Sequence, residues 1–148
     1  MTTTIDNFTG QYDFLSNFYA RPFEWEGETW RTSEHAFNAA KTLLPGERIW
    51  VRDAKTPGEA KRRGRVVTLR NDWDKHWRYV LMYDIVRTKF SDPVMQDMLA
   101  STHDSILVEG NTWHDGLWGV CRCATCPPGR NCLGILLMQI RFDIVRGI

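Results

Sequence analysis

The stretch LRNDWDKHWRYVLMYDIVRTKF, residues 69–90, constrains the fold more than any other part of the sequence. Its apolar and aromatic side chains recur at helical spacing, so we expect it to form the longest helix of the chain, ending near Phe90. Asn71 or Asp72 is expected to cap its first turn. A helix with one apolar face buries that face against other elements, so the stretch predicts a packed, helix-rich domain.

Other segments carry local start signals for further helices and for short strands. TPGE, residues 56–59, is a capping box with proline at the first helical position, and it predicts a helix to about residue 64. Ser91-Asp92-Pro93 predicts another helix to about residue 100, and CLGILLMQIRFDIV predicts an amphipathic helix near the end of the chain. PFEWEGETW, residues 22–30, predicts a short hairpin, and SILVE near residue 107 predicts a strand. The expected fold class is therefore α+β, helix-rich with a small β component.

The length of 148 residues fits a single domain over residues 1–148, because no repeat, linker or low-complexity tract divides the sequence. A hydrophobic content of 43% and a net charge of +1 are typical of a soluble globular protein and exclude a global attraction to nucleic acid or anionic membranes. No stretch approaches 18 apolar residues, and MTTTIDNFTGQYDF lacks the features of a signal peptide. We therefore expect a cytoplasmic protein with no membrane contact and no obligatory protein partner.

An acid, an amide and an amine fall on one helical face in RTSEHAFNAAK, residues 31–41. Glu34, Asn38 and Lys41 stand at positions i, i+4 and i+7, so their polar ends can reach one small volume. Thr32 or Ser33 is expected to cap this helix. On this segment alone, an ordinary solvated helix face with an i,i+7 charge pair is the favoured explanation, and a site is the alternative.

A second polar group lies in NTWHDGLWG, residues 111–119, between two tryptophans. Trp113 and Trp118 could stack a flat base, and Gly119 allows close approach of the backbone to a ligand. The alternative is a turn packed on the core, in which Asp115 caps backbone amides. Both interpretations stay open on the sequence alone.

The segment AKRRGR, residues 60–65, is the one dense basic cluster of the sequence. A solvated helix face explains it adequately, above all for Lys61 and Arg62. The functional alternative is phosphate binding, in which one or two arginines make bidentate contacts.

All four cysteines lie between residues 121 and 132. Cys123 and Cys126 have the spacing that places two thiolates on one Zn²⁺, and Cys121 is close enough to be a third ligand. Cys132, His114 or His103 could supply the fourth. We weigh a structural zinc against reduced thiols without a metal, and expect a disulfide least in a cytoplasmic protein. No cofactor is expected to be required for catalysis.

Several fragments together resemble the NADAR family of YbiA-like proteins: FLSNF, TSEHAFNAAK, AKTPGEAKRRGR, RNDW, TKF, DGLWG and GRNCLGILLMQIR. The resemblance covers nearly the whole chain. It implies a compact α+β N-glycoside hydrolase that cleaves a base from a ribose bearing phosphate groups. Some relatives act on riboflavin-pathway intermediates and others on ADP-ribosylated guanine, and we expect ADP-ribosylated guanine, free or linked to nucleic acid, to be the substrate here.

The resemblance also implies roles for individual residues. It places Glu34, Lys41 and Asp115 in catalysis, and it places the following residues in substrate binding: Asn17, Phe18, Lys89, Trp118, Gly119 and Asn131. From the residue types and spacing described above, we add Asn38, Arg65 and Trp113 to the expected substrate-binding residues. Two departures bear on substrate choice. Asn38 stands where glutamine is common in the family, and the cysteines between residues 118 and 131 are missing from many members.

The chemistry of such a reaction fits these residue types. Breaking a C1′–N bond builds positive charge on the ribose and negative charge on the leaving base, so a carboxylate and a positioned water are required. Lysine could hold phosphate or, as a neutral amine, attack C1′ of an opened sugar. The alternatives are a riboflavin-pathway substrate and a non-catalytic module that binds ADP-ribose, or binds nucleic acid through the cysteines and AKRRGR.

Overall fold

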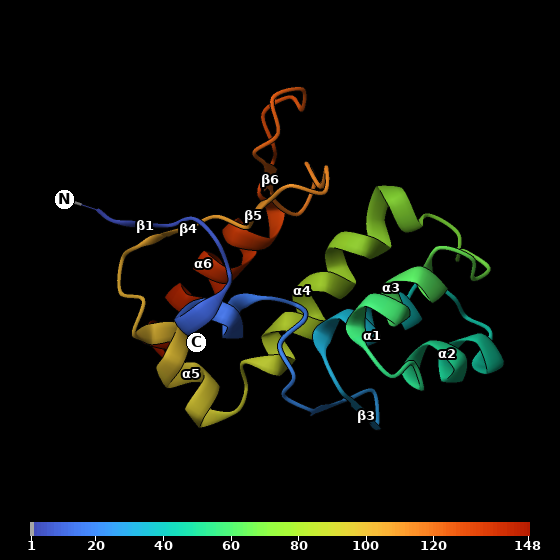
Figure 1. Cartoon of the computed structure of the whole chain (residues 1–148). Helices are drawn as coiled ribbons and strands as arrows, with labels where there is room; N and C mark the ends of the chain where they lie inside the picture. Colours follow the sequence, from blue (N-terminus) through green and yellow to red (C-terminus); the bar gives the residue numbers. More distant parts are fainter. Residues whose placement is uncertain (1) are drawn as a thin grey trace. The chain divides into compact units, whose positions relative to one another are not determined.

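The computed structural model describes residues 2–148 and divides the chain into two compact units (Figure 1). Unit 2 is one continuous segment, Asn17–Ser91, whereas unit 1 combines Met1–Ser16 with Asp92–Ile148. Within the described residues the elements are six α-helices, a 3-10 helix, a π-helical turn and short strands in two-stranded pairs. The α+β, helix-rich class is therefore confirmed, while the single domain over residues 1–148 stays a prediction.

Unit 2 begins with a hairpin of β2 (Phe23–Trp25) and β3 (Glu28–Trp30), which pair antiparallel as predicted. Glu26 and Gly27 form its turn with positive φ angles of 52° and 76°. Both central residues of a two-residue type I′ turn need positive φ, and this turn matches the twist of the strands. Trp25 and Trp30 are buried, with ring centroids 5.9 Å apart.

Four α-helices and one π-helical turn complete unit 2: α1 (Ser33–Ala39), α2 (Pro45–Arg52), α3 (Pro57–Gly64), η2 (Trp73–Trp77) and α4 (Arg78–Lys89). The Thr56 side chain accepts a hydrogen bond of 3.1 Å from the Glu59 N–H, which confirms the predicted cap, while the Glu59 carboxylate accepts from the Lys55 N–H at 2.9 Å instead of from the Thr56 N–H. The prediction for residues 69–90 was wrong in two details. Asp72 adopts a left-handed conformation and makes no side-chain cap, and the stretch is not one α-helix: η2 runs directly into the 12-residue α4, which by itself is shorter than the last helix.

Unit 1 contains η1 (Gly10–Leu15), α5 (Pro93–Ala100) and the 15-residue α6 (Cys132–Arg146). Its strands are β1 (Thr4–Ile5) with β4 (Ile106–Leu107), and β5 (Gly110–Asn111) with β6 (Val120–Cys121), both pairs parallel. Asp92 caps α5 by accepting from the Val94 N–H at 2.9 Å, as predicted. The core of this unit is formed by buried side chains of α5, β4 and α6: Met95, Leu99, Leu107, Leu133, Leu137 and Ile140.

Among residues 2–148 no helix is long and apolar enough to cross a membrane. The cytoplasmic location stays a prediction.

Candidate functional site

The start of α1 is fixed by hydrogen bonds to its own cap and to Asn17. Thr32 caps the helix by accepting from the His35 N–H at 3.2 Å, as predicted. The Ser33 hydroxyl donates to Asn17 Oδ1 at 2.9 Å, and the Glu34 N–H donates to the Asn17 carbonyl at 3.0 Å. Asn17, which the family resemblance places in substrate binding, is thus buried and positions the helix turn that carries Glu34.

Glu34 and Asn38 form a buried pair on α1. They are 9% and 1% exposed, and the Asn38 amide donates to Glu34 Oε1 at 3.0 Å and to the Glu34 carbonyl at 2.8 Å. An ordinary surface stripe leaves such groups in water, whereas here a carboxylate is held in a fixed orientation with little exposure. The solvated-stripe interpretation is therefore wrong for these two residues.

Gly64, the last residue of α3, allows that helix to approach α1 at Asn38. A Cβ atom at Gly64 would lie 2.1 Å from Asn38 Oδ1 and 2.7 Å from Asn38 Cβ. Real Cβ atoms do not approach other atoms this closely, so glycine is required here for packing. Gly64 is not among the site residues predicted from the sequence, although a glycine inside a helical segment is a signal of close backbone approach.

Lys41 follows α1 by two residues and is half-buried beside these groups. Burial lowers the pKa of Lys41, the charge of Glu34 acts in the opposite direction, and the charges of Arg65 and Lys61 add to the lowering. Its ammonium nitrogen lies 5.9 Å from the centroid of the Phe37 ring. The structure thus brings Glu34, Asn38 and Lys41 into one neighbourhood with two cations of α3 and its C-cap.

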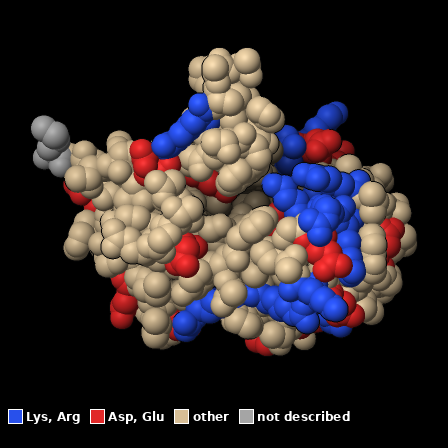
Figure 2. All heavy atoms as spheres, in the orientation of Figure 1, with Lys and Arg blue, Asp and Glu red and all other residues tan. Residues whose placement is uncertain are grey.

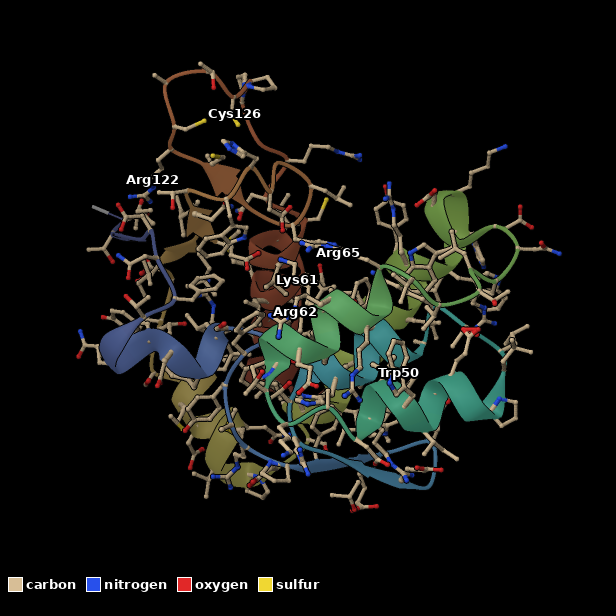
Figure 3. All side chains as sticks on the ribbon, turned by 45° about the vertical axis from the view of Figure 1, so that its right-hand side comes forward. Trp50, Lys61, Arg62, Arg65, Arg122 and Cys126 are labelled. Carbon is tan, nitrogen blue, oxygen red and sulfur yellow. The ribbon has the colours of Figure 1, made fainter. Side chains whose placement is uncertain are left out.

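Figure 2 shows Lys and Arg side chains gathered on the part of unit 2 that carries α3. Lys61, Arg62 and Arg65 extend from this segment in Figure 3. Arg63 is engaged elsewhere, since it bonds Glu59 at 2.6 Å and stacks on Trp50 with its guanidinium carbon 5.0 Å from the ring centroid. Arg62 and Arg65 are exposed.

Two further predicted residues of unit 2 lie near its beginning and end. Lys89 is only 4% exposed, and its ammonium nitrogen lies 5.7 Å from the Tyr19 ring centroid and 5.2 Å from that of Phe90. Phe18 is 45% exposed. The roles of Lys89 and Phe18 in binding stay predictions.

In unit 1, Asp115 caps a turn. Its Oδ1 accepts from the N–H groups of Leu117 and Trp118 at 3.0 and 2.9 Å. The Asn111 side chain bonds the backbone of Asp115 twice, by donating to its carbonyl at 2.9 Å and accepting from its N–H at 3.2 Å. The sequence-based prediction that Asp115 caps backbone amides is therefore correct for its Oδ1 atom. A catalytic role for Asp115 stays a prediction. Trp113 is 59% exposed and Trp118 is half-buried.

Asn131 and Gly119, which belong to the family motifs, both determine how backbone segments of unit 1 pack. Asn131 precedes α6 with a positive φ of 53°, and its side chain bonds the Glu109 N–H at 3.0 Å and the Leu107 carbonyl at 2.9 Å. A Cβ at Gly119 would lie 2.1 Å from the Glu109 carbonyl oxygen. Asn131 therefore links the segments on either side of it, Gly119 lets two backbone segments approach closely, and the contacts of both residues with substrate stay predictions.

His114, Cys121, Cys123 and Cys126 form a cluster, called the Cys3His cluster below, whose ligand atoms all lie within 4.8 Å of one another. All four cysteines of the sequence are free. The pKa of Cys123 is lowered to about 5 by hydrogen bonds, first from Thr125 and then from Cys126, and the pKa of Cys126 is raised to about 12 by its bond with Cys123. Within the described residues the group does not include Cys132 or His103, so of the candidates for a fourth ligand only His114 joins it.

A separate depression of unit 2, of about 220 Å³, lies between the hairpin and α2. It is lined by Glu26, Glu28, Trp30, Pro45, Arg48 and Ile49, and contains none of the predicted site residues. Its charged side chains form ion pairs near the surface, among them Arg48 with Glu26 at 2.7 Å, so we do not assign the chemistry to it.

Comparison with known proteins agrees with the fold and with the motifs. Residues 6–145 match the model of the NADAR domain. The chain is 37% identical to N-glycosidase YbiA of Escherichia coli (strain K12) over 147 residues, which span 95% of this chain and 89% of that protein. It is 35% identical to the chloroplastic riboflavin biosynthesis protein PYRR of Zea mays over 97% of this chain, but over only 26% of that protein. The NMR structure of Escherichia coli YbiA superposes with a TM-score of 0.85 at 34% identity, covering 99% of this chain and 88% of the other.

Proposed function

Since this chain belongs to the NADAR family, we propose that this N-glycoside hydrolase cleaves the C1′–N bond between a base and a phosphate-bearing ribose, with ADP-ribosylated guanine as its substrate. The observation that carries the proposal is the buried pair of Glu34 and Asn38 beside Lys41. A buried carboxylate with a fixed orientation, next to an amine whose pKa is lowered, is typical of a catalytic site.

The proposed reaction adds water across the C1′–N bond. Positive charge develops on the ribose and negative charge on the base, so the base must receive a proton and a water must lose one. Glu34 exchanges these protons, and its ionised form stabilises the positive ribose. Asn38 holds Glu34 Oε1 in place through its hydrogen bond of 3.0 Å, so the carboxylate needs no reorientation when the charge develops.

Lys41 has two roles compatible with its environment. As an ammonium it binds a phosphate oxygen. As a neutral amine it adds to C1′ of the ring-opened sugar, the C1′–N bond to the base breaks, and the base leaves with a proton; water then hydrolyses the resulting Schiff base and regenerates the amine. Burial lowers its pKa, which increases the neutral fraction at a given pH. Trapping with borohydride distinguishes the roles, since only the Schiff base leaves a stable adduct on the protein.

The number of cations beside the pair supports a substrate with more than one phosphate. Lys61 and Arg65, which extend from the same segment (Figure 3), both act electrostatically on Lys41. A pyrophosphate carries more negative charge than a single phosphate and uses several cations in its recognition. The pyrophosphate of ADP-ribose therefore suits this cluster.

A second candidate substrate is a ribosylated pyrimidine phosphate of riboflavin synthesis. It is supported by the similarity to the Zea mays PYRR protein and by the match of 39% identity over 100 residues to the PYRR protein of Arabidopsis thaliana. A single phosphate on the ribose would use fewer of the basic side chains of α3.

One experiment compares the two substrates directly. The purified protein is incubated with ADP-ribosylated guanosine and, separately, with the ribosylaminopyrimidine phosphate, and the released base is measured by chromatography. From ADP-ribosylated guanosine we expect release of guanosine, with ADP-ribose as the other product, at the higher kcat/KM. Release from the pyrimidine alone would transfer the assignment to the second candidate, and release from neither, with binding retained, would support a non-catalytic module that binds ADP-ribose.

A further inference from the structure

The geometry points to a structural zinc site formed by His114, Cys121, Cys123 and Cys126 in unit 1. All four residues come from one short stretch of the chain. His114 follows β5, Cys121 ends β6, and Cys123 and Cys126 lie in the segment between β6 and α6. Figure 3 shows Cys126 on the loop beyond β6. The site lies outside the proposed reaction, because none of its ligands belongs to the buried pair or to Lys41.

The nitrogen-to-sulfur distances match those of a tetrahedral zinc centre. His114 Nδ1 lies 3.2 Å from Cys126 Sγ, 3.5 Å from Cys123 Sγ and 3.8 Å from Cys121 Sγ. With zinc bonds of about 2.0–2.1 Å to nitrogen and about 2.3 Å to sulfur, a tetrahedron has a nitrogen-to-sulfur edge of about 3.6 Å. The three separations scatter around that edge length.

Hydrogen bonds alone explain the arrangement poorly. Nδ1 of a histidine has either one hydrogen or one lone pair, so it makes one good hydrogen bond rather than three. A metal ion at the centre accounts for three sulfurs around one nitrogen, because each of the four atoms then directs its own lone pair at the ion. The ligand set of three thiolates and one imidazole is also one that structural zinc sites use.

The position of the cluster suggests what the metal would stabilise. Residues 112–130 form a long loop around β6, and the strands β5 and β6 at its base have only two residues each. Asp115 is adjacent to His114 in sequence, and its own turn is held by hydrogen bonds from Asn111, Leu117 and Trp118. A zinc bound to the cluster would tie both branches of the loop together and fix the turn that contains Asp115.

Zinc content tests the site directly. Protein purified without chelator is reduced, exposed to zinc, freed of excess metal and analysed for bound metal. We expect about one equivalent in the wild type and in Cys132→Ser, the matched control outside the cluster, against less than about a tenth of an equivalent in Cys126→Ser. A wild-type content below a tenth of an equivalent, or equal loss in Cys132→Ser, would overturn the site.

A second measurement needs no variant and therefore does not depend on the folding of one. The wild type is alkylated with and without zinc, and the modified cysteines are identified by mass spectrometry. Zinc should protect Cys121, Cys123 and Cys126 but leave the rate at Cys132 unchanged, and a chelator should remove the protection. Equal reactivity with and without zinc, or a disulfide within the cluster that persists in the reduced, zinc-treated protein, would contradict the proposal.

Discussion

Glu34 lies on a helix whose seven residues are all buried, whereas Asp115 lies in a loop flanked by strands of two residues each. The first carboxylate is oriented by a buried amide on the next turn, and the second by backbone N–H groups two and three residues away. Helix packing and a close contact with α3 fix Glu34, while Asp115 depends on local hydrogen bonds. This difference predicts that changes around Glu34 alter chemistry and core packing, and that changes around Asp115 first alter loop order.

The largest effect is expected for Glu34→Gln. The substitution keeps the shape of the side chain and its ability to accept from Asn38, but removes the charge and the proton exchange. A placed carboxylate contributes about 10²–10⁴ in rate, so kcat should fall at least 100-fold while the melting temperature stays nearly constant. Base-release kinetics and thermal melts on the same preparation measure both. A fully active variant would remove Glu34 from the mechanism and make Asp115 the leading candidate.

Gly64→Ala should act on both stability and rate. Its new methyl group would overlap Asn38, which is held by Glu34, so the helices must separate or Asn38 must move. Overpacking of this kind costs about 1–3 kcal/mol. Denaturant unfolding measures the loss, and a reduced kcat should accompany it because the orientation of Glu34 changes.

Gly58→Ala is the matched control for that variant, because a Cβ at this position of α3 meets only ordinary contacts at 3.7 Å or more. Its stability should stay the same or rise slightly. If both alanine variants behave alike, the close approach of α3 to α1 does not determine the geometry of the site.

Asp115 needs two substitutions to separate capping from catalysis. Asp115→Ala removes the acceptor of two N–H groups and should cost about 0.5–2 kcal/mol, as loss of a cap does. Asp115→Asn retains an acceptor oxygen, so it should leave the loop ordered. A large fall in kcat for the asparagine variant would show a catalytic carboxylate, whereas activity near that of the wild type would show that Asp115 serves the turn.

Arg65 and Arg62 are both exposed on the same segment. They differ in their effect on Lys41, because of the two only Arg65 has a charge that lowers the pKa of Lys41. Arg65→Gln should raise KM about 5-fold through the loss of roughly 1 kcal/mol of phosphate binding, and Arg62→Gln should leave it nearly unchanged. Steady-state kinetics at two salt concentrations measure both. Equal effects would indicate attraction by the whole basic surface rather than a phosphate contact at Arg65.

The smallest effect concerns the pH dependence of stability. The pKa of Lys41 is lowered by burial, so between its folded value and its ordinary value near 10.5 the unfolded chain binds more protons than the folded one. The free energy of unfolding should therefore gain a positive slope with pH in that alkaline window through Lys41. Lys41→Met should abolish this contribution. An identical slope for wild type and variant in urea melts would contradict the lowered pKa.

Elements with complete local signals could be predicted from the sequence. Thr56-Pro57 and Asp92-Pro93 set helix starts within a few residues, and the hairpin follows from Glu26-Gly27 between aromatic residues. The start of the helical stretch at Asp72 could not be predicted, because Asp72 is left-handed and the residues after it form a π-helical turn, which no local sequence pattern specifies.

The candidate site shows the same division. The common face of Glu34, Asn38 and Lys41 follows from their spacing, but the burial of that face depends on Gly64 and Asn17, which are remote in sequence. His114 and Cys132 are both within a few residues of the other three cysteines in sequence. The fold of the loop therefore decides that His114, and not Cys132, lies beside them. The family motifs identified Asn131 but not its structural role, which is to bond the Glu109 N–H and the Leu107 carbonyl at β4.

The division of unit 1 into two chain segments has a consequence for the order of folding. Thr4 of β1 pairs with Ile106, and the Thr3 and Ser105 hydroxyls are 2.8 Å apart, so these contacts close a loop of about one hundred residues. Unit 2 has all its residues within that loop and can complete its own contacts while the ribosome is still adding the C-terminal segment. We therefore expect pulse-labelled amides of unit 2 to become protected from exchange before those of β1 and β4.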